Sequence, residues 1–264
     1  MKILVTVKEV AEVEDDFEIS GTEISETYLE YDLNEWDDYA IEEAVQLQEE
    51  GVADEVVAVT IGPERSEETI RMALAKGADR AIRVWDDAFE DVDLLDVDAK
   101  AQLLGAVVED EDPELVLTGV QANDDSFGAT GVALARHLGF EWAAVVNDLD
   151  LDADAGVAHV RRELEGGVEE LTDVEIPAVL TIQTGINDPR YASLRGIRQA
   201  QQKEIAPKTL GDLGLDASVL DSDLALTEMY EPESESEAQF IEGDASDQAA
   251  TLAETLQDLG VVGE

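Results

Sequence analysis

Short apolar runs alternate with amphipathic segments over the first half of the chain. Four runs rich in β-branched residues have the length of buried strands: 3–7, 56–61, 81–84 and 115–118. Three stretches with apolar residues at helical spacing separate them, beginning near Asn34, Ser66 and Asp98. Asn34 and Ser66 are expected to act as N-caps. This order of strands and helices predicts a doubly wound, mostly parallel α/β sheet with right-handed crossovers.

The pattern becomes less regular after Gly139. Alternating segments at 157–164 and 168–174 flank Gly166-Gly167, and this arrangement predicts a β-hairpin. A further apolar run at 176–183 predicts another buried strand.

Three other segments have weaker patterns. Residues 23–31 predict a loop with some extended pairing. Residues 216–246 are acidic and weakly periodic, and they predict an extended C-terminal arm. Apolar residues at helical spacing over 247–259 predict a terminal helix.

A small polar loop, Gly119 to Gly131, joins the strand 115–118 to a helical pattern over 132–139. In parallel α/β proteins a nucleotide phosphate binds at such a junction, because unpaired N–H groups and the helix dipole favour an anion there. Glycines in the loop would let the backbone approach a ligand closely. The alternative is a surface loop that needs glycines in order to turn.

Two carboxylates in this loop have two possible roles. Asp124 and Asp125 would either hold ribose hydroxyls or orient the loop through hydrogen bonds to the N–H groups that follow them. The chain has no P-loop lysine motif, so phosphoryl transfer lacks its usual cation.

The charge of the chain is extreme. Lys and Arg number 16 against 65 Asp and Glu, a net charge of −49 that is spread over the whole length. Such a field repels nucleic acid and anionic membranes, so we expect neither as a partner. An apolar content of 44% is ample for a core. The composition predicts a halophile's cytosolic protein, the alternative being an acidic interaction protein.

Several other classes of protein are excluded. The chain has no cysteine, which rules out disulfides and thiolate catalysis, and its two histidines, His137 and His159, lack metal-ligand spacing. No apolar run approaches the roughly 20 residues of a membrane span. Residues 1–8 read as a strand rather than a signal peptide. We therefore expect a soluble, cytoplasmic protein without a metal site.

Aromatic residues mark two further places. The loop 185–197 combines Pro189, Arg190, Tyr191 and Leu194, a mixture typical of interface hot spots; the alternative is an ordered loop whose aromatic residue caps the core. Composition alone favours Trp36 as a core residue over a cofactor contact.

Nine segments together resemble the β subunit of electron transfer flavoprotein. They occur in the family's order over most of the chain: 2–10, 34–47, 59–63, 70–79, 115–131, 162–167, 176–179, 188–194 and 211–214. The segment Asp-Pro-Arg-Tyr-Ala-Ser-Leu at 188–194 is the most specific, because no general requirement of the fold calls for it.

The resemblance implies an adenine-nucleotide α-hydrolase-like fold in a heterodimer whose α subunit holds most of a redox-active FAD. Residues 1–205 would form a nucleotide-binding domain, and 206–264 an arm and helix that pack on the α subunit. In one branch of the family this domain binds AMP, and in the electron-bifurcating branch it binds a second FAD. The resemblance implies these nucleotide contacts: Thr6, Asn34, Glu35, Trp36, Asp37, Ile61, Asp124, Asp125, Ser126, Phe127, Gly128, Ala129, Thr130, Gly131, Val132, Ala133, Leu134 and Ala135.

Two further expectations follow from the resemblance. Trp36 would lie near the flavin of the α subunit. The loop 185–197, with Pro189, Arg190 and Tyr191, would be the family's recognition loop, in which Leu194 anchors partner dehydrogenases.

The loop sequence bears on the branch. In the bifurcating branch this loop resembles Asp-Gly-Asp-Thr-Ala-Gln-Val-Gly-Pro. Here Asp125 replaces the first glycine of that motif. Its carboxylate should crowd or repel the additional pyrophosphate of FAD. We therefore expect AMP, although residues 126–129 depart from both patterns. Residues 199–203 lack the family's run of lysines, which puts electrostatic steering of acidic partners in question.

The resemblance thus predicts an electron carrier rather than a bond-making catalyst. It would accept electrons from acyl-CoA and related flavin dehydrogenases of fatty acid β-oxidation and pass them towards a quinone reductase. The alternatives are a bifurcating subunit and a stand-alone adenine-nucleotide module of the universal-stress type.

Overall fold

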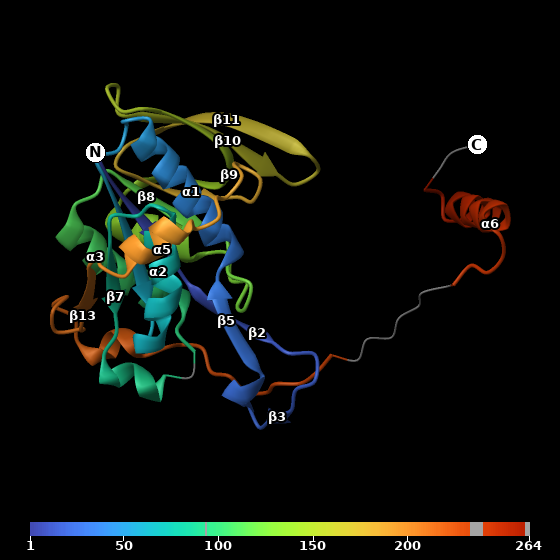
Figure 1. Ribbon diagram of the computed structural model, residues 1–264, viewed down its shortest axis with the longest axis horizontal. Helices are drawn as coiled ribbons and strands as arrows, with labels where there is room; N and C mark the ends of the chain where they lie inside the picture. Colours follow the sequence, from blue (N-terminus) through green and yellow to red (C-terminus); the bar gives the residue numbers. More distant parts are fainter. Residues whose placement is uncertain (93, 233–239, 262–264) are drawn as a thin grey trace. The chain divides into compact units, whose positions relative to one another are not determined.

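The chain forms two compact units in the computed structural model, Met1–Met229 and Tyr230–Glu264. The structure describes residues 1–92, 94–232 and 240–261 (Figure 1). The larger unit is built on a nine-stranded sheet with the order β11-β10-β9-β12-β8-β1-β6-β7-β13. Its strands are β1 Lys2–Thr6, β6 Glu55–Ile61, β7 Arg80–Val84, β8 Leu115–Gly119, β9 Glu141–Asp152, β10 Val157–Leu164, β11 Val168–Glu175, β12 Ala178–Ile182 and β13 Ile205–Lys208.

Neighbouring strands from β9 to β13 in this order are parallel, and β10 and β11 continue the sheet antiparallel at one edge. Helices cover both faces: α1 Glu35–Glu49, α2 Glu67–Lys76, α3 Val97–Glu111, α4 Thr130–Leu138 and α5 Leu194–Ala200. The predicted doubly wound α/β sheet and its hairpin are confirmed.

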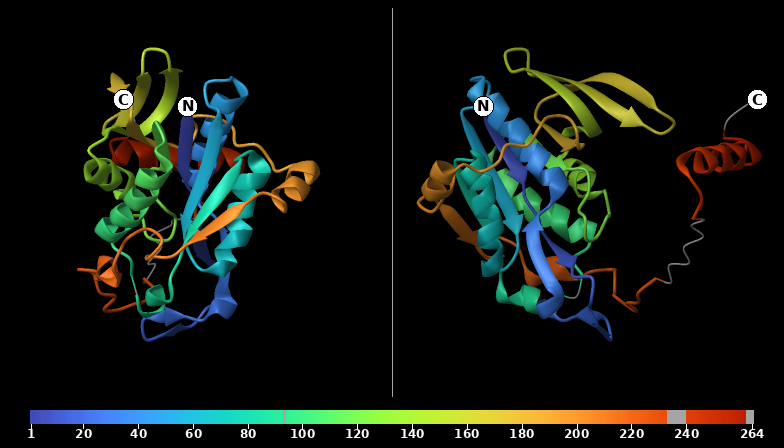
Figure 2. Two further views of the ribbon diagram at one scale, coloured as in Figure 1. Left: turned by 90° about the vertical axis from the view of Figure 1, so that its left-hand side faces the viewer. Right: turned by 45° about the vertical axis from the view of Figure 1, so that its right-hand side comes forward.

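Alternating side chains of each strand feed two separate cores. On β1, Ile3 and Val5 pack with α1 and α2, whereas Leu4 packs with α3 and α4 on the opposite face. Figure 2 shows the sheet between these two helical layers. Because such strands are buried on both faces, they appear in the sequence as continuous apolar runs, which is why they could be recognised.

The strand order creates a crevice beside β1. From β1 the chain moves outward through β6 and β7, and it then returns to β8 on the other side of β1 before reaching β12. The connections therefore leave β1 and β8 in opposite directions. In open α/β sheets, ligands bind at the carboxyl ends of the strands at such a switch point.

Some elements were not predicted. β9 has 12 residues and a bulge, where Val145 has φ 62° and donates its N–H to Thr181 Oγ1 at 3.0 Å. β13 is an edge strand of four residues that includes Pro207. The bulge interrupts the alternation of β9, and β13 is too short to give a pattern.

The segment between β1 and α1 contains more regular structure than expected. β2 Glu9–Val13 pairs with β5 Leu29–Leu33, and β3 Ile19–Ser20 pairs with β4 Glu23–Ile24. These pairs confirm the expected extended pairing. Short 3-10 helices complete the unit: Glu26–Tyr28, Glu64–Ser66, Asp87–Asp91 and Ala217–Leu220.

Three predicted helix starts need correction. Asn34 and Ser66 precede α1 and α2, but neither side chain caps its helix. The hydroxyl of Ser66 donates instead to Glu9 Oε1 at 3.1 Å. α3 begins at Val97, one residue before Asp98, because Asp96 accepts the N–H of Ala99 at 2.8 Å.

The predicted arm starts later than residue 216. Val219 and Leu220 are buried in the core beside α3. Residues 233–239 of the predicted arm lie outside the described residues. The predicted terminal helix is present as α6 Ala245–Asp258, capped by Asp244. The division at 205/206 stays a prediction.

Helix α5 is held closely against α2. A Cβ at Gly196 would collide with the carbonyl oxygen of Ala75, so the two helices approach as closely as only glycine permits. Arg71 Nη1 donates to the Ala200 carbonyl at 2.7 Å. Lys203 Nζ donates to the carbonyls of Leu74, in the last turn of α2, and of Ala78, just after the helix. A lysine there is also favoured by the helix dipole.

This packing predicts that Gly196→Ala destabilises the chain. Alanine would be favoured by about 1 kcal/mol in a free helix, but here the added methyl group meets a backbone oxygen, and overpacking of this kind costs about 1–3 kcal/mol. The thermal unfolding midpoint in concentrated salt should therefore fall. Gly211→Ala is the matched control, because a Cβ there meets nothing closer than Thr209 Oγ1 at 3.8 Å. An unchanged midpoint for Gly196→Ala would contradict the close packing.

Candidate functional site

A cavity of about 400 Å³ opens at the switch point, beside the carboxyl ends of β1, β6 and β8. It has the size of small-molecule sites. Half of the predicted nucleotide contacts line it: Thr6, Asn34, Asp37, Ile61, Asp124, Asp125, Gly128, Ala129 and Thr130. The structure therefore brings together residues that are far apart in the sequence.

The other predicted contacts do not line the cavity: Glu35, Trp36, Ser126, Phe127, Gly131, Val132, Ala133, Leu134 and Ala135. Leu134 and Ala135 are buried in the core on the sheet-facing side of α4. Glu35 and Ser126 are exposed. Nucleotide contacts by these residues stay a prediction.

Asp37 holds the two central strands together at the floor of the site. Its carboxylate accepts the N–H of Lys8 at 2.8 Å and the N–H of Gly119 at 3.0 Å, one just beyond β1 and the other at the end of β8. Only 4% of Asp37 is exposed. Burial raises the pKa of Asp37 from 3.8 to about 7, and the two N–H donors offset part of this effect.

Gly119 is required by this contact. A Cβ at this position would lie 2.6 Å from Asp37 Oδ1 and 2.6 Å from Trp36 Cβ. The first glycine of the loop is therefore needed so that α1 can approach β8. It is not explained by a turn of the chain or by contact with a ligand.

Asn34 fixes the loop from the same end of α1. Its Nδ2 donates to the Gln121 carbonyl at 2.9 Å, and its Oδ1 accepts the N–H of Asn123 at 3.2 Å. These two bonds explain why the side chain does not cap the helix. The loop after β8 is thus positioned by side chains of α1.

Two lysines meet the two loop carboxylates at the cavity wall. Lys8 Nζ lies 2.5 Å from Asp124 Oδ1 and 2.9 Å from Asp125 Oδ2, and Lys100 Nζ lies 2.6 Å from the same Asp125 oxygen. Burial alone would raise the pKa of Asp125, but the hydrogen bonds from Lys100 and Lys8 outweigh it and lower the pKa. Asp125 also accepts the N–H of Phe127 at 3.2 Å, so the expected loop-orienting hydrogen bond is present.

Sequence reasoning missed both lysines. Lys8 could have been noticed, because it follows a strand that ends at the switch point. Lys100 gave no signal, since it comes from α3 and reaches the loop only through the tertiary fold. Lys100 also lies over the ring of Phe127, with 5.0 Å from its Nζ to the ring centroid.

Part of the cavity wall is apolar. Val59, Ile61, Trp85, Leu95 and Leu104 contribute to it. Trp85 is stacked on Phe89 with 4.8 Å between ring centroids, which fixes its plane. The site therefore joins an apolar wall, suited to a flat base, to a polar end with cations.

The N-terminus of α4 faces the polar end through Ala129 and Thr130, which line the cavity. No side chain caps this helix, and its first turn contains no acidic residue. A Cβ at Gly131 would lie 2.5 Å from Thr118 Oγ1, so α4 starts in close contact with β8. Free N–H groups and the helix dipole favour an anion at this place.

The loop 185–197 is fastened to α1 by its polar residues. Arg190 Nε lies 2.8 Å from Glu42 Oε2, and its Nη1 lies 2.6 Å from Glu49 Oε1. Asn187 Nδ2 donates to the Tyr39 carbonyl at 3.1 Å and to Glu43 Oε2 at 2.9 Å. The guanidinium of Arg190 therefore positions the loop, and its predicted contact with a partner stays a prediction.

Two large apolar residues of this loop point outward. Tyr191 is 97% exposed and Leu194 is 80% exposed, whereas Pro189 is half-buried. The alternative interpretation, in which the aromatic residue caps the core, is therefore wrong. A fixed loop that presents two large apolar side chains to solvent is typical of a binding surface.

Trp36 lies outside the cavity at the start of α1. It is half-buried, and its Nε1 donates to Gln183 Oε1 at 3.0 Å, just after β12. Its predicted place near a flavin of another subunit stays a prediction.

No group of three or more potential ligands within the described residues has the arrangement of a metal site. His159 pairs with Asp173 at 2.7 Å on the exposed hairpin, and His137 lies over Gly105 on α3. No helix in the described part of the chain is long and apolar enough to cross a membrane.

Comparison with known proteins identifies the family. Residues 22–212 match the family described as "Electron transfer flavoprotein domain". The chain is 46% identical to the electron transfer flavoprotein subunit beta of Methylophilus methylotrophus over 98% of both chains. The chain belongs to the electron transfer flavoprotein β-subunit family.

More distant relatives agree. The mitochondrial subunit beta of Arabidopsis thaliana is 38% identical over 88% of this chain and 90% of its own, and that of Bacillus subtilis is 31% identical over 97% and 98%. The resemblance stated from the sequence is thus confirmed. Membership in this family implies an electron-transport role in a flavoprotein system and assembly with an α subunit.

The two hydrogen bonds of Asp37 predict that Asp37→Asn lowers the stability of the fold by an amount that depends on pH. An amide would place an N–H₂ group against one of two backbone donors, and losing a buried hydrogen bond costs about 1–3 kcal/mol. Because its pKa is raised to about 7, folded Asp37 keeps a proton that the unfolded chain releases. Its contribution to stability is therefore fully present below pH about 4 and is lost as the pH rises through about 7.

The measurement is the free energy of unfolding of wild type and Asp37→Asn at pH 5 and pH 8, in one salt concentration. The wild type should be more stable at both, with the larger difference at pH 5. A difference that grows with pH would contradict the raised pKa of Asp37.

Proposed function

We propose that this chain is the β subunit of a heterodimeric electron transfer flavoprotein that binds AMP as a structural ligand. It accepts electrons from flavin dehydrogenases, with acyl-CoA dehydrogenases of β-oxidation as the expected donors, and passes them towards a quinone reductase. The observation that carries the AMP site is the cavity at the switch point, whose lining combines apolar residues, two lysines and the uncapped N-terminus of α4.

The residues present fit an adenine mononucleotide. Ile61, Trp85 and Leu95 offer an apolar surface for the base. The loop before α4 offers backbone N–H groups for one phosphate, and Lys8 and Lys100 neutralise the carboxylates of Asp124 and Asp125 that would otherwise repel it. A ligand that binds only the folded chain raises its stability, so AMP would strengthen the contacts around β1 and β8.

Asp125 supports AMP over a second FAD. It is bonded to lysines from two different elements and lies in the cavity wall. A dinucleotide would need these bonds to open in order to place its second phosphate and second ring system. The neutralising lysines weaken simple repulsion by Asp125, which is the one observation in favour of the bifurcating alternative.

The chain itself has no proposed role in making or breaking bonds. The redox chemistry belongs to the FAD that the α subunit mainly holds, and Trp36 is proposed to lie beside it. Helix α6 supports an α-subunit contact, because Leu252 and Leu259 are exposed within its unit. We propose that this arm and helix pack on the α subunit.

The charge of −49 supports a cytosol with concentrated salt, where screening reduces the repulsion among 65 acidic residues. A stand-alone nucleotide-binding module would need neither the exposed Tyr191 nor the exposed Leu194. We therefore prefer the heterodimeric carrier in the cytoplasm of a halophile.

Acid extraction of the purified heterodimer tests the cofactors. We expect one FAD and one AMP per heterodimer, identified by chromatography and mass. Two FAD would establish the bifurcating alternative. Recovery of a stable, colourless monomer in high salt, with no flavoprotein partner, would contradict the heterodimer itself.

Leu194→Ala tests the docking loop. Leu194 is exposed in the free subunit, and truncation of a hot-spot residue costs about 2 kcal/mol or more. We therefore expect the second-order rate constant for reduction by the dehydrogenase to fall by about tenfold or more. Heterodimer assembly and nucleotide content should not change.

The matched control is Leu171→Ala on β11, since Leu171 and Leu194 are both 80% exposed. The control should leave the rate constant unchanged. Equal effects of the two substitutions, or none from Leu194→Ala, would show that Leu194 is not an anchor.

A further inference from the structure

Most of the positive charge of this chain is bound within the chain itself. Among the described residues, thirteen of the 16 lysines and arginines contact a carboxylate or a backbone carbonyl. The three others are Arg136, Arg195 and Arg198. With 65 acidic residues available, a free guanidinium is unusual, and two of the three lie one turn apart on α5.

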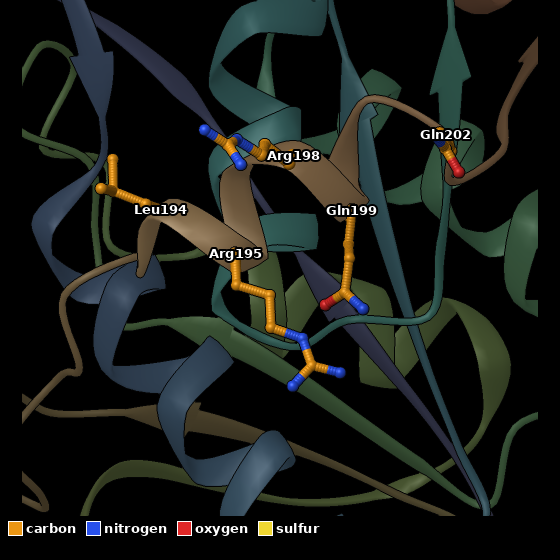
Figure 3. A pocket seen from close by; sticks show the side chains of 5 residues that line it. All are labelled: Leu194, Arg195, Arg198, Gln199 and Gln202. Carbon is orange, nitrogen blue, oxygen red and sulfur yellow. The ribbon is translucent and has the colours of Figure 1, made fainter.

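Arg195 and Arg198 lie beside the exposed Leu194. Together with Gln199 and Gln202, these three residues line a surface hollow of about 430 Å³ (Figure 3). In Figure 3 the two guanidinium groups extend from α5 in different directions, and Leu194 stands at its first turn. We call these five residues the α5 surface. It combines a large apolar side chain with two uncompensated cations.

The backbone beneath this surface is fixed. The hydroxyl of Ser193 accepts the N–H of Gly196 at 3.0 Å at the start of α5. The contacts of Gly196, Arg71 and Lys203 hold the helix on α2, as described above. A partner therefore needs to order only the ends of two arginine side chains, which lowers the entropic cost of binding.

We propose that Arg195 and Arg198 bind carboxylates on the docking face of the dehydrogenase, around the site that receives Leu194. This inference rests on the proposed function. An acidic face is repelled by most of a surface of charge −49, so the α5 surface is where it can approach. Guanidinium groups bind carboxylates through two parallel hydrogen bonds, and this geometry fixes orientation as well as charge.

The proposal changes the meaning of the lysine-poor segment 199–203. Gln199 and Gln202 lie on the α5 surface, and Lys203 is bonded to the end of α2, so none of these three supplies a free charge for a partner. Arg195 and Arg198 supply it from the preceding turn. Electrostatic selection is thus retained and placed directly next to the apolar anchor.

The test compares charge reversals at matched positions. Arg195→Glu and Arg198→Glu are compared with Arg136→Glu, which makes the same change in charge at another exposed arginine. Arg136 belongs to α4, which packs on the opposite face of the sheet from α5. The assay follows reduction of the intact heterodimer by an acyl-CoA dehydrogenase from the same cells that reduces the wild type.

We expect kcat/KM for the heterodimer as substrate to fall about tenfold for Arg195→Glu and for Arg198→Glu, and the loss to shrink as salt is raised. Arg136→Glu should stay within about twofold of wild type. Arg195→Lys should recover part of the rate, because it keeps the charge but not the paired hydrogen bonds. Reduction by dithionite, which needs no docking, should be equal in all variants.

Three results would overturn the proposal. The first is an equal effect of Arg136→Glu and the two α5 variants. The second is a loss that also appears with dithionite or in heterodimer assembly, which would make the arginines structural. The third is a change only in the proteolysis of residues 230–264, which would identify the occupant as the chain's own C-terminal unit.

Reduction of the wild-type heterodimer by a flavin dehydrogenase tests the proposed function separately from this inference. If no flavin dehydrogenase reduces the wild-type heterodimer, both fail. If the wild type is reduced and the α5 variants behave like Arg136→Glu, only the role of the arginines fails. Rescue of Arg195→Glu by a Glu→Lys substitution on the dehydrogenase would identify the paired carboxylate.

Discussion

The carboxylate of Asp37 connects the three elements on which the site depends. It accepts N–H groups from the ends of β1 and β8, and it belongs to the first turn of α1. In a doubly wound sheet these two strands separate the two halves of the fold, and their following loops diverge to form a crevice. A buried carboxylate bonded across this point fixes the width of the crevice. The same requirement makes residue 119 a glycine, because a side chain there would displace Asp37.

Helix α1 links the cavity to the loop 185–197. Its first turn holds Asp37 and is preceded by Asn34, which fixes the loop before α4. Glu42 and Glu49, further along the same helix, bind Arg190 of the loop 185–197. One helix of 15 residues therefore fixes the loop before α4 and the loop 185–197 relative to each other. A nucleotide bound in the cavity would stabilise the start of this helix, and so it would support the loop without touching it.

Sequence patterns were sufficient to predict an element when the pattern lies within that element alone. The buried strands, the hairpin and the strand–loop–helix junction were predicted because each has its own periodicity or turn residues. β9 was not predicted, because the bulge at Val145 breaks its alternation. The site was predicted only in part for a related reason. Lys100 meets Asp125 through tertiary packing of α3, and no spacing in the sequence encodes that contact. Asn34 was recognised as a helix boundary, but its side chain bonds to a loop 87 residues away.

The distribution of cations separates structural from functional charge. In a chain with 65 acidic residues and 16 basic ones, a cation finds a carboxylate nearby almost wherever the fold places it. Lys8 and Lys100 are bound to the loop carboxylates, and Arg190 is bound to α1. Lys203 lies against backbone carbonyls, where burial lowers its pKa but a lysine still completes the end of α2. Arg195 and Arg198 differ from all of these, since nothing in the described fold uses their charge. Exposed apolar side chains alone would bind many surfaces. In the proposed role, the adjacent arginines add a condition on charge, so that the fixed loop would distinguish an acidic docking face from other apolar surfaces.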